Sequence, residues 1–102
     1  MQTRVHRRLF LGFVQIHILH HATAGPVYGA WMLEELSRHG YMLSPGTMYL
    51  FLHAMQTSGL LLQEQKIVNG KIRKYYIATR AGEQVLEEAR KKAAELVREI
   101  NR

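Results

Sequence analysis

The chain contains no cysteine and no aspartate among its 102 residues. Without cysteine there is no disulfide, no thiolate metal site and no cysteine nucleophile. The acidic residues are all glutamate, and none forms the carboxylate pair in an apolar setting that acid–base catalysis uses. A glycine-rich phosphate-binding loop is also missing. These absences argue against an enzyme and against a bound cofactor, and the lack of cysteine agrees with a cytoplasmic protein.

The longest hydrophobic run is too short to cross a bilayer. LFLGFVQIHIL, residues 9–19, follows three arginines and precedes the small residues ATA, an arrangement that imitates a secretory signal. Gly12, Gln15 and His17 interrupt the run, whereas a spanning helix needs about 20 apolar residues. We expect instead a helix over residues 4–22 that is apolar nearly all round and buried on most faces, with no membrane association.

Positive charge is concentrated in one segment. The net charge is +6, and KIVNGKIRKYYIATRAG, residues 66–82, holds five Lys or Arg and no acidic residue. A localised basic block indicates a polyanionic partner such as nucleic acid. The alternative is a solvated face that only keeps the protein soluble.

Turn and cap signals divide the rest of the chain. The breaker AGP at 24–26 precedes a second helix over about residues 28–39. Ser44 as N-cap and Pro45 at the first helical position begin a third helix, which Gly59 ends. Residues 60–79 then form a two-stranded ribbon, because Asn69-Gly70 favours a type I′ turn. This turn pairs residue 68 with 71, 67 with 72 and 62 with 77.

The last helix is predicted from Thr79, as its cap, to about Ile100. Its apolar positions are spaced 3, 4, 3 and 4 residues apart, which is a heptad seam suited to pairing with a second copy. The alternative is that the seam packs back on its own domain. The predicted dimer residues are Leu86, Ala89, Ala93, Leu96 and Ile100.

The element order predicts a mainly α fold with a small β-ribbon. We expect a winged helix-turn-helix over residues 1–80 and a C-terminal dimerisation helix over 81–102, forming one compact unit. A helix-turn-helix lays the start of its second helix in the major groove, and the cations of a wing meet phosphates. The candidate DNA contacts are Ser44, Gly46, Thr47, Tyr49 and His53 on the helix, and Asn69, Gly70, Lys71, Arg73, Lys74 and Tyr75 on the wing.

Two other features of the sequence are candidate ligand-binding sites. His17, His20 and His21 have spacings that can hold a metal, but no Cys, Asp or nearby Glu completes a site. We therefore expect core or interface histidines and no metal. Trp31 is a candidate contact for a small effector; the methionines around it are more simply explained as core.

The motifs together resemble the PadR-type winged-helix transcriptional regulators over nearly the whole chain. Gly25, Pro26 and Gly29 match a Gly-Pro-x-x-Gly stretch, and SPGTMY at 44–49 matches a Ser-Pro-Gly-Thr-Leu-Tyr signature. Residues 70–76 match the Gly-Arg-x-Arg-Lys-Tyr-Tyr wing, with Lys71 in place of the first arginine. Residues 79–82 match Thr-x-Ala-Gly. Leu50 and Ala54 depart from the proline and arginine common in the family.

The resemblance implies a dimeric, sequence-specific DNA-binding protein, usually a repressor, that recognises a near-palindromic operator and is sometimes relieved by a small molecule. Residues 83–102 hold no aromatic residue, which speaks against a drug sandwiched between aromatic rings at the dimer helix. Residues 44–59 hold no Arg or Lys, so the common arginine–guanine contact must come from the wing. A non-specific architectural DNA binder and a winged-helix protein-interaction module are the alternatives.

Overall fold

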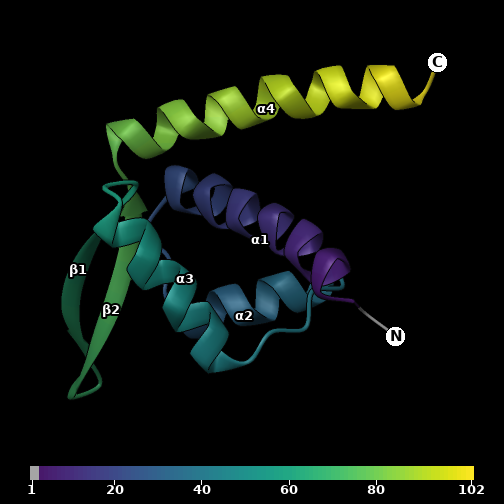
Figure 1. Cartoon of the computed structure of the whole chain (residues 1–102). Coiled ribbons are helices and arrows are strands. Elements are labelled where there is room, and N and C mark those ends of the chain that lie inside the picture. Colours follow the sequence, from purple (N-terminus) through teal and green to yellow (C-terminus); the bar gives the residue numbers. More distant parts are fainter. Residues whose placement is uncertain (1–2) are drawn as a thin grey trace.

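Four helices and one hairpin make up residues 3–102, the part of the chain that the computed structural model describes. Figure 1 shows the first three helices as a bundle, the hairpin projecting beside them, and the last helix running along the first. This is the mainly α winged helix-turn-helix that the sequence predicts. The elements are α1 (Arg4–Ala24), α2 (Gly29–Arg38), α3 (Pro45–Thr57), β1 (Leu61–Val68), β2 (Lys71–Ala78) and α4 (Arg80–Ile100).

The predicted caps begin the helices where the sequence places them. The Ser44 hydroxyl accepts a hydrogen bond from the Thr47 backbone N–H at 3.1 Å, and Pro45 occupies the first turn of α3. The Thr79 hydroxyl accepts from the Gly82 N–H at 3.0 Å at the start of α4. Each bond satisfies an N–H that has no partner within the helix.

The hairpin has the predicted register. Asn69 and Gly70 have φ values of 53° and 77°, the left-handed conformations that a type I′ turn requires. Val68 therefore pairs with Lys71, and the ladder runs back to Leu61 and Ala78. Two backbone hydrogen bonds between Val27 and Tyr76, of 3.0 and 2.7 Å, hold β2 to the segment between α1 and α2.

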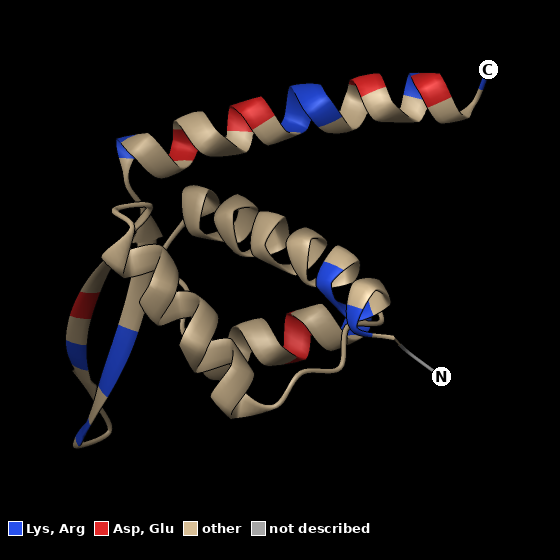
Figure 2. Cartoon of the chain, viewed as in Figure 1, with Lys and Arg blue, Asp and Glu red and all other residues tan. Residues whose placement is uncertain are grey.

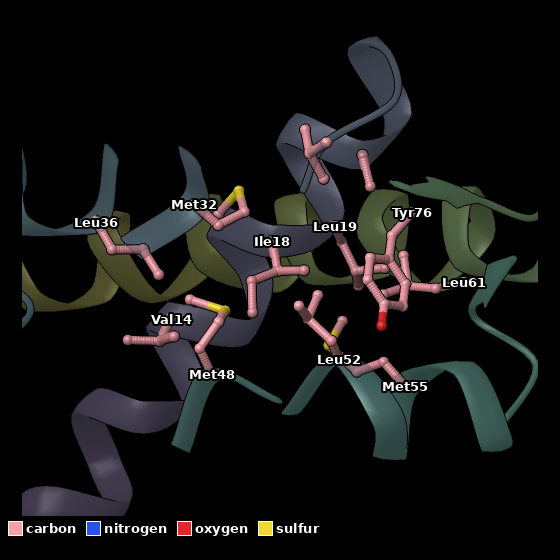
Figure 3. Packing of buried hydrophobic residues seen from close by; sticks show 12 residues of the cluster. Val14, Ile18, Leu19, Met32, Leu36, Met48, Leu52, Met55, Leu61 and Tyr76 are labelled. Atoms are coloured by element: carbon pink, nitrogen blue, oxygen red, sulfur yellow. The ribbon is translucent and has the colours of Figure 1, made fainter. Parts of the chain in front are cut away.

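A single core lies between α1, α2, α3 and the base of the hairpin (Figure 3). Tyr76 is buried there with 3% of its surface exposed, whereas the neighbouring Tyr75 is half-buried. On α3 the buried position is Leu52, whereas Phe51 is only half-buried. The buried residues are Val14, Ile18, Leu19, Ala22, Val27, Met32, Leu36, Met48, Leu52, Met55, Leu61 and Tyr76.

The expectation that α1 is buried on most faces is wrong for the single chain. Val5 and Leu9 are 75% and 61% exposed, and Phe10 and Phe13 are each 39% exposed. The remaining chain covers only one side of α1, so an apolar face is left open. No helix in the described residues 3–102 is long and apolar enough to cross a membrane.

The junction between the hairpin and α4 is tightly built. The Thr79 hydroxyl donates to the Gly59 carbonyl at 2.6 Å, and the Thr79 N–H donates to the Leu60 carbonyl at 3.0 Å. A Cβ atom on Gly82 would overlap the Leu60 carbonyl oxygen. The Thr-x-Ala-Gly motif thus has two structural reasons. Thr79 caps α4 and also anchors the hairpin, and Gly82 lies too close to the Leu60 carbonyl for any side chain.

Candidate nucleic-acid interface

The start of α3 is exposed and presents small or hydrogen-bonding groups. Ser44 and Gly46 are exposed and Thr47 is half-buried, and the Ser44 hydroxyl also donates to the Thr47 hydroxyl at 3.0 Å. Tyr49 is 52% exposed, and its ring stacks on that of His53 with centroids 5.8 Å apart. The five predicted contacts on α3 therefore lie along one accessible stretch of the helix.

The cations of the hairpin are free of carboxylate partners. Among residues 3–102, Arg38, Arg90 and Arg102 form ion pairs, but no Lys or Arg between residues 66 and 74 does. Figure 2 shows these cations along the ribbon and at its tip, with one acidic residue on β1. Their charge is therefore available to an external anion.

Aromatic rings support the basic side chains of the hairpin. The Arg73 guanidinium lies over the Tyr28 ring at 4.2 Å, and the Tyr28 ring meets Tyr75 edge-on at 5.5 Å. The Lys66 ammonium lies 5.2 Å from the centre of the Tyr75 ring. These cation–π contacts fix the basic groups in place without neutralising them.

The hairpin and α3 meet through one pair of predicted residues. The Lys74 ammonium lies 6.0 Å from the centre of the Tyr49 ring. Both residues line a groove of about 520 Å³ between the hairpin and the α2–α3 pair, together with Arg73. The structure thus brings Tyr49, Arg73 and Lys74 together, whereas Asn69, Gly70 and Lys71 stand apart at the tip of the hairpin.

Tyr28 and Lys66 were absent from the predicted site. Tyr28 is the residue that caps the start of α2, so the sequence predicted its place at the beginning of that helix but not its contact with β2. Lys66 belongs to the basic segment, and its position opposite Arg73 in the predicted register was the signal that could have found it.

The predicted seam of α4 divides into two parts. Leu86 and Ala89 are half-buried and line a groove of about 380 Å³ against Phe13 and Ile16 of α1. Leu96 and Ile100 are 50% and 69% exposed. The first half therefore packs on its own domain, as the alternative reading of the sequence held, and the second half does not.

The predicted histidines lie where α1 crosses α2. His17 and His21 are half-buried, whereas His20 is exposed. Burial lowers the pKa of His17, and the nearby His39, His21 and His20 lower it further. Burial is likewise the main cause that lowers the pKa of His21. His39, which follows α2, joins them but was not expected from the sequence.

Trp31 is half-buried on α2. Its ring meets His21 edge-on at 5.3 Å, and it lines a shallow cavity of about 350 Å³ with Pro26 and Val27. The arrangement leaves part of the indole open to a ligand.

The fold and the hairpin define a winged-helix protein, and comparison with known proteins gives its family. The chain matches the model of the transcriptional regulator PadR-like family over residues 18–88. The transcriptional regulator Rv3488 of Mycobacterium tuberculosis is 52% identical over 87 residues, which are 85% of this chain and 81% of that protein. The chain therefore belongs to the PadR-like family, and it is a transcriptional regulator, not an enzyme.

Solved structures share the same architecture. A PadR-like regulator from Bacillus cereus superposes with a TM-score of 0.83 at 29% identity, covering 92% of this chain and 93% of that one. Bacillus subtilis PadR, solved in complex with operator DNA, gives a TM-score of 0.68 at 19% identity. That match covers 74% of this chain and 45% of the other, and it concerns the fold alone.

Proposed function

We propose that the chain is a sequence-specific double-stranded DNA-binding regulator that acts as a dimeric repressor. One observation carries the proposal: unpaired cations on the hairpin lie beside the exposed start of α3, joined by Lys74 and Tyr49 at 6.0 Å. That juxtaposition suits a helix in the major groove and a wing on the adjoining backbone. The operator complex of Bacillus subtilis PadR supports it by analogy of fold.

Each part of the interface has its own task in this proposal. Thr47 and Tyr49 reach base edges, and the free N–H groups at the start of α3 suit a phosphate oxygen. Lys71 and Lys74 neutralise phosphates, and Tyr75 donates from its phenol. Arg73, held over Tyr28, positions the wing and supplies the cation that α3 lacks. Ser44 maintains the helix start, with Gly46, His53, Asn69 and Gly70 completing the surface.

We further propose that two copies pair through α4 and the open face of α1. Apolar residues of both helices line the α1–α4 groove, and both helices carry further exposed apolar residues. Burying these surfaces together would stabilise a dimer by about 25 cal/mol per Å² of apolar surface. In this arrangement residues 1–80 bind DNA and helix 81–102 joins the copies. A two-fold dimer requires a near-palindromic operator, and a regulator of transcription works where the DNA is, in the cytoplasm.

A non-specific architectural role is the second candidate, and one observation favours it. Pro45–Thr57 contains no Arg or Lys, so α3 cannot make the arginine–guanine contact that most often specifies sequence. Selection from a random-duplex pool decides between the two. Enrichment of one near-palindrome supports the regulator, uniform recovery supports the architectural protein, and no recovery at moderate salt supports a protein-interaction module.

The wing is tested by the salt dependence of DNA binding. Lys71→Ala should lower affinity for all duplexes alike and reduce the slope of log K against log salt by about one, because one phosphate contact is lost. Lys91→Ala is the matched control, since it removes the same charge from α4, away from the hairpin. Equal slopes for the two variants would contradict the wing contact. Repression is tested separately, by transcription in vitro from a promoter that holds the selected site.

The effector remains a separate proposal about Trp31. A ligand seated on the open part of the indole would quench or shift tryptophan fluorescence, and Trp31 is the chain's single tryptophan. Screening small aromatic molecules by this signal, with DNA release as the second readout, tests whether one regulates the protein. Fluorescence that no compound alters would count against this role.

A further inference from the structure

Four side chains from two helices converge where α1 crosses the end of α2. His17 and His21 are one turn apart on α1. Glu35 lies on α2, and His39 is the residue that caps the end of α2, one turn later. Side chains separated by four residues share one face of a helix, so each helix offers a pair to the other. We call this set the His–Glu cluster; it comprises His17, His21, Glu35 and His39.

The distances within the cluster approach those of a metal site. One nitrogen from each of the three histidines lies within 4.8 Å of the others. Glu35 Oε2 is 3.6 Å from His21 Nε2 and 3.2 Å from His39 Nε2. Ligands at about 2.0–2.2 Å around a tetrahedral zinc ion are roughly 3.3 Å apart. The contacts of Glu35 with His21 and His39 already have this length. The histidine nitrogens, which lie within 4.8 Å of one another, would have to move closer together on binding.

A second observation points to a missing ligand. His21 Nε2 is buried and has no hydrogen-bond partner within the described residues. A buried polar atom without a partner destabilises the folded protein, and such an atom calls for an explanation such as a bound ion.

The ligand types define the class of metal. Three imidazoles and one carboxylate suit Zn²⁺, Co²⁺ and Ni²⁺, whereas Mg²⁺ and Ca²⁺ prefer oxygen ligands throughout. Arg38 donates to Glu35 Oε1 at 2.8 Å and leaves Oε2 turned toward the histidines. An arginine on the far oxygen orients the carboxylate in the way that outer partners of metal ligands do.

We propose that the His–Glu cluster binds one divalent transition-metal ion of the zinc type and thereby ties α1 to α2. The sequence predicts no metal here, because it indicates no further ligand beyond the three histidines of α1. His39 supplies that ligand because the turn after α2 returns it to α1, where its ring stacks on His17 at 4.7 Å. The site concerns the free chain and is independent of whether the protein binds DNA.

The test uses tag-free protein treated with a chelator and then dialysed. Titration calorimetry with Zn²⁺ should give one ion per chain, and Mg²⁺ should give no binding. Zinc at a hundredfold excess over its dissociation constant should raise the melting temperature by roughly 10 °C. Co²⁺ should develop the intense visible absorption of a four-coordinate site.

Three variants locate the site. His21→Gln and His39→Gln should each weaken zinc binding by at least about tenfold and abolish the cobalt spectrum, with folding checked by circular dichroism. His20→Gln is the matched control, because it removes a neighbouring imidazole that is exposed and outside the cluster. The proposal is overturned if wild-type protein binds no zinc, or if His20→Gln loses as much affinity as the cluster variants.

Discussion

Gly82 shows, at the scale of one residue, how the base of the wing is fixed. Its Cα passes so close to the Leu60 carbonyl that any Cβ would overlap that oxygen. Gly29 belongs to another family motif, yet a Cβ there would meet only Leu52 Cδ1, at 3.7 Å. Of these two motif glycines, only Gly82 is therefore required by steric contact in the single chain.

Replacing Gly82 by alanine should destabilise the protein by about 1–3 kcal/mol, because the α4 start must move away from the hairpin. Urea unfolding followed by circular dichroism measures the change. Gly29→Ala is the control and should lie within roughly 0.5 kcal/mol of the wild type. If the two variants were equally stable, the close approach would not be a constraint.

At the scale of elements, the sequence predicts the structure best where a short local motif determines the backbone conformation. Asn69-Gly70 determines its own turn, and the turn then determines the register of β1 and β2. Ser44 and Thr79 likewise act within one helical turn. The exposure of α1 could not be predicted, because it depends on how much surface the rest of the chain can cover. The contact between His39 and His17 could not be predicted either, because it depends on how α1 and α2 cross, and no local sequence pattern indicates that crossing.

The packing of α1 on α2 should weaken as the pH falls. The pKa values of His17 and His21 are lowered in the folded protein, so the unfolded chain binds more protons below the ordinary pKa of 6.5. The free energy of unfolding therefore falls from about pH 7 downward and levels off below the folded pKa values. Partial burial raises the pKa of Glu35, but the His39 hydrogen bond and the His21 and Arg38 charges lower it overall, so its contribution is also lost in acid.

Thermal unfolding between pH 5 and 8, in buffer with a chelator, measures this dependence. His17→Gln should flatten it, because one of the two shifted groups is gone. His53→Gln on the exposed face of α3 should leave the slope as in the wild type. A wild-type melting temperature that stayed constant from pH 7 to 5 would contradict the assignment.

The outer half of α4 should hold two copies together. Leu96→Glu would bury a charge without a partner in the proposed interface, at a cost of about 3 kcal/mol or more, which weakens the dimer more than a hundredfold. Light scattering across a dilution series measures dissociation. Lys91→Glu, on the opposite face of the same helix, should leave the dimer intact. A Leu96→Glu protein that stays dimeric on dilution would rule out this seam.

At the scale of the whole molecule, the surfaces proposed for DNA binding and for pairing are separate. The chain extends 54 Å along its longest axis and 22 Å along its shortest. The hairpin and α3 lie together on one side, and α4 runs along α1 on the other (Figure 1). A pair formed through α4 would hold two α3 helices at a fixed distance, which suits half-sites about one DNA turn apart, roughly 34–36 Å.

Inserting five base pairs between the operator half-sites should abolish tight binding, because it turns one half-site to the opposite side of the duplex. Since each half-site must be held at the same time, we expect a loss of at least about hundredfold. Gel-shift titration measures it, with a mutated half-site as the reference for one-copy binding. Equal affinity for the original and lengthened operators would show that the copies bind independently.

The connection between β2 and α4 consists of Thr79 alone, since β2 ends at Ala78 and α4 begins at Arg80. A connection of one residue cannot accommodate an insertion without moving α4 relative to the hairpin. One added residue at the start of α4 would rotate the rest of that helix by about 100° relative to the hairpin. In a dimer formed through α4, the two hairpins would then no longer face the DNA in the same way. In such a dimer, a new spacing of the operator half-sites would have to arise through changes in the pairing surface of α1 and α4. An insertion at Thr79 would instead misalign both DNA-binding surfaces.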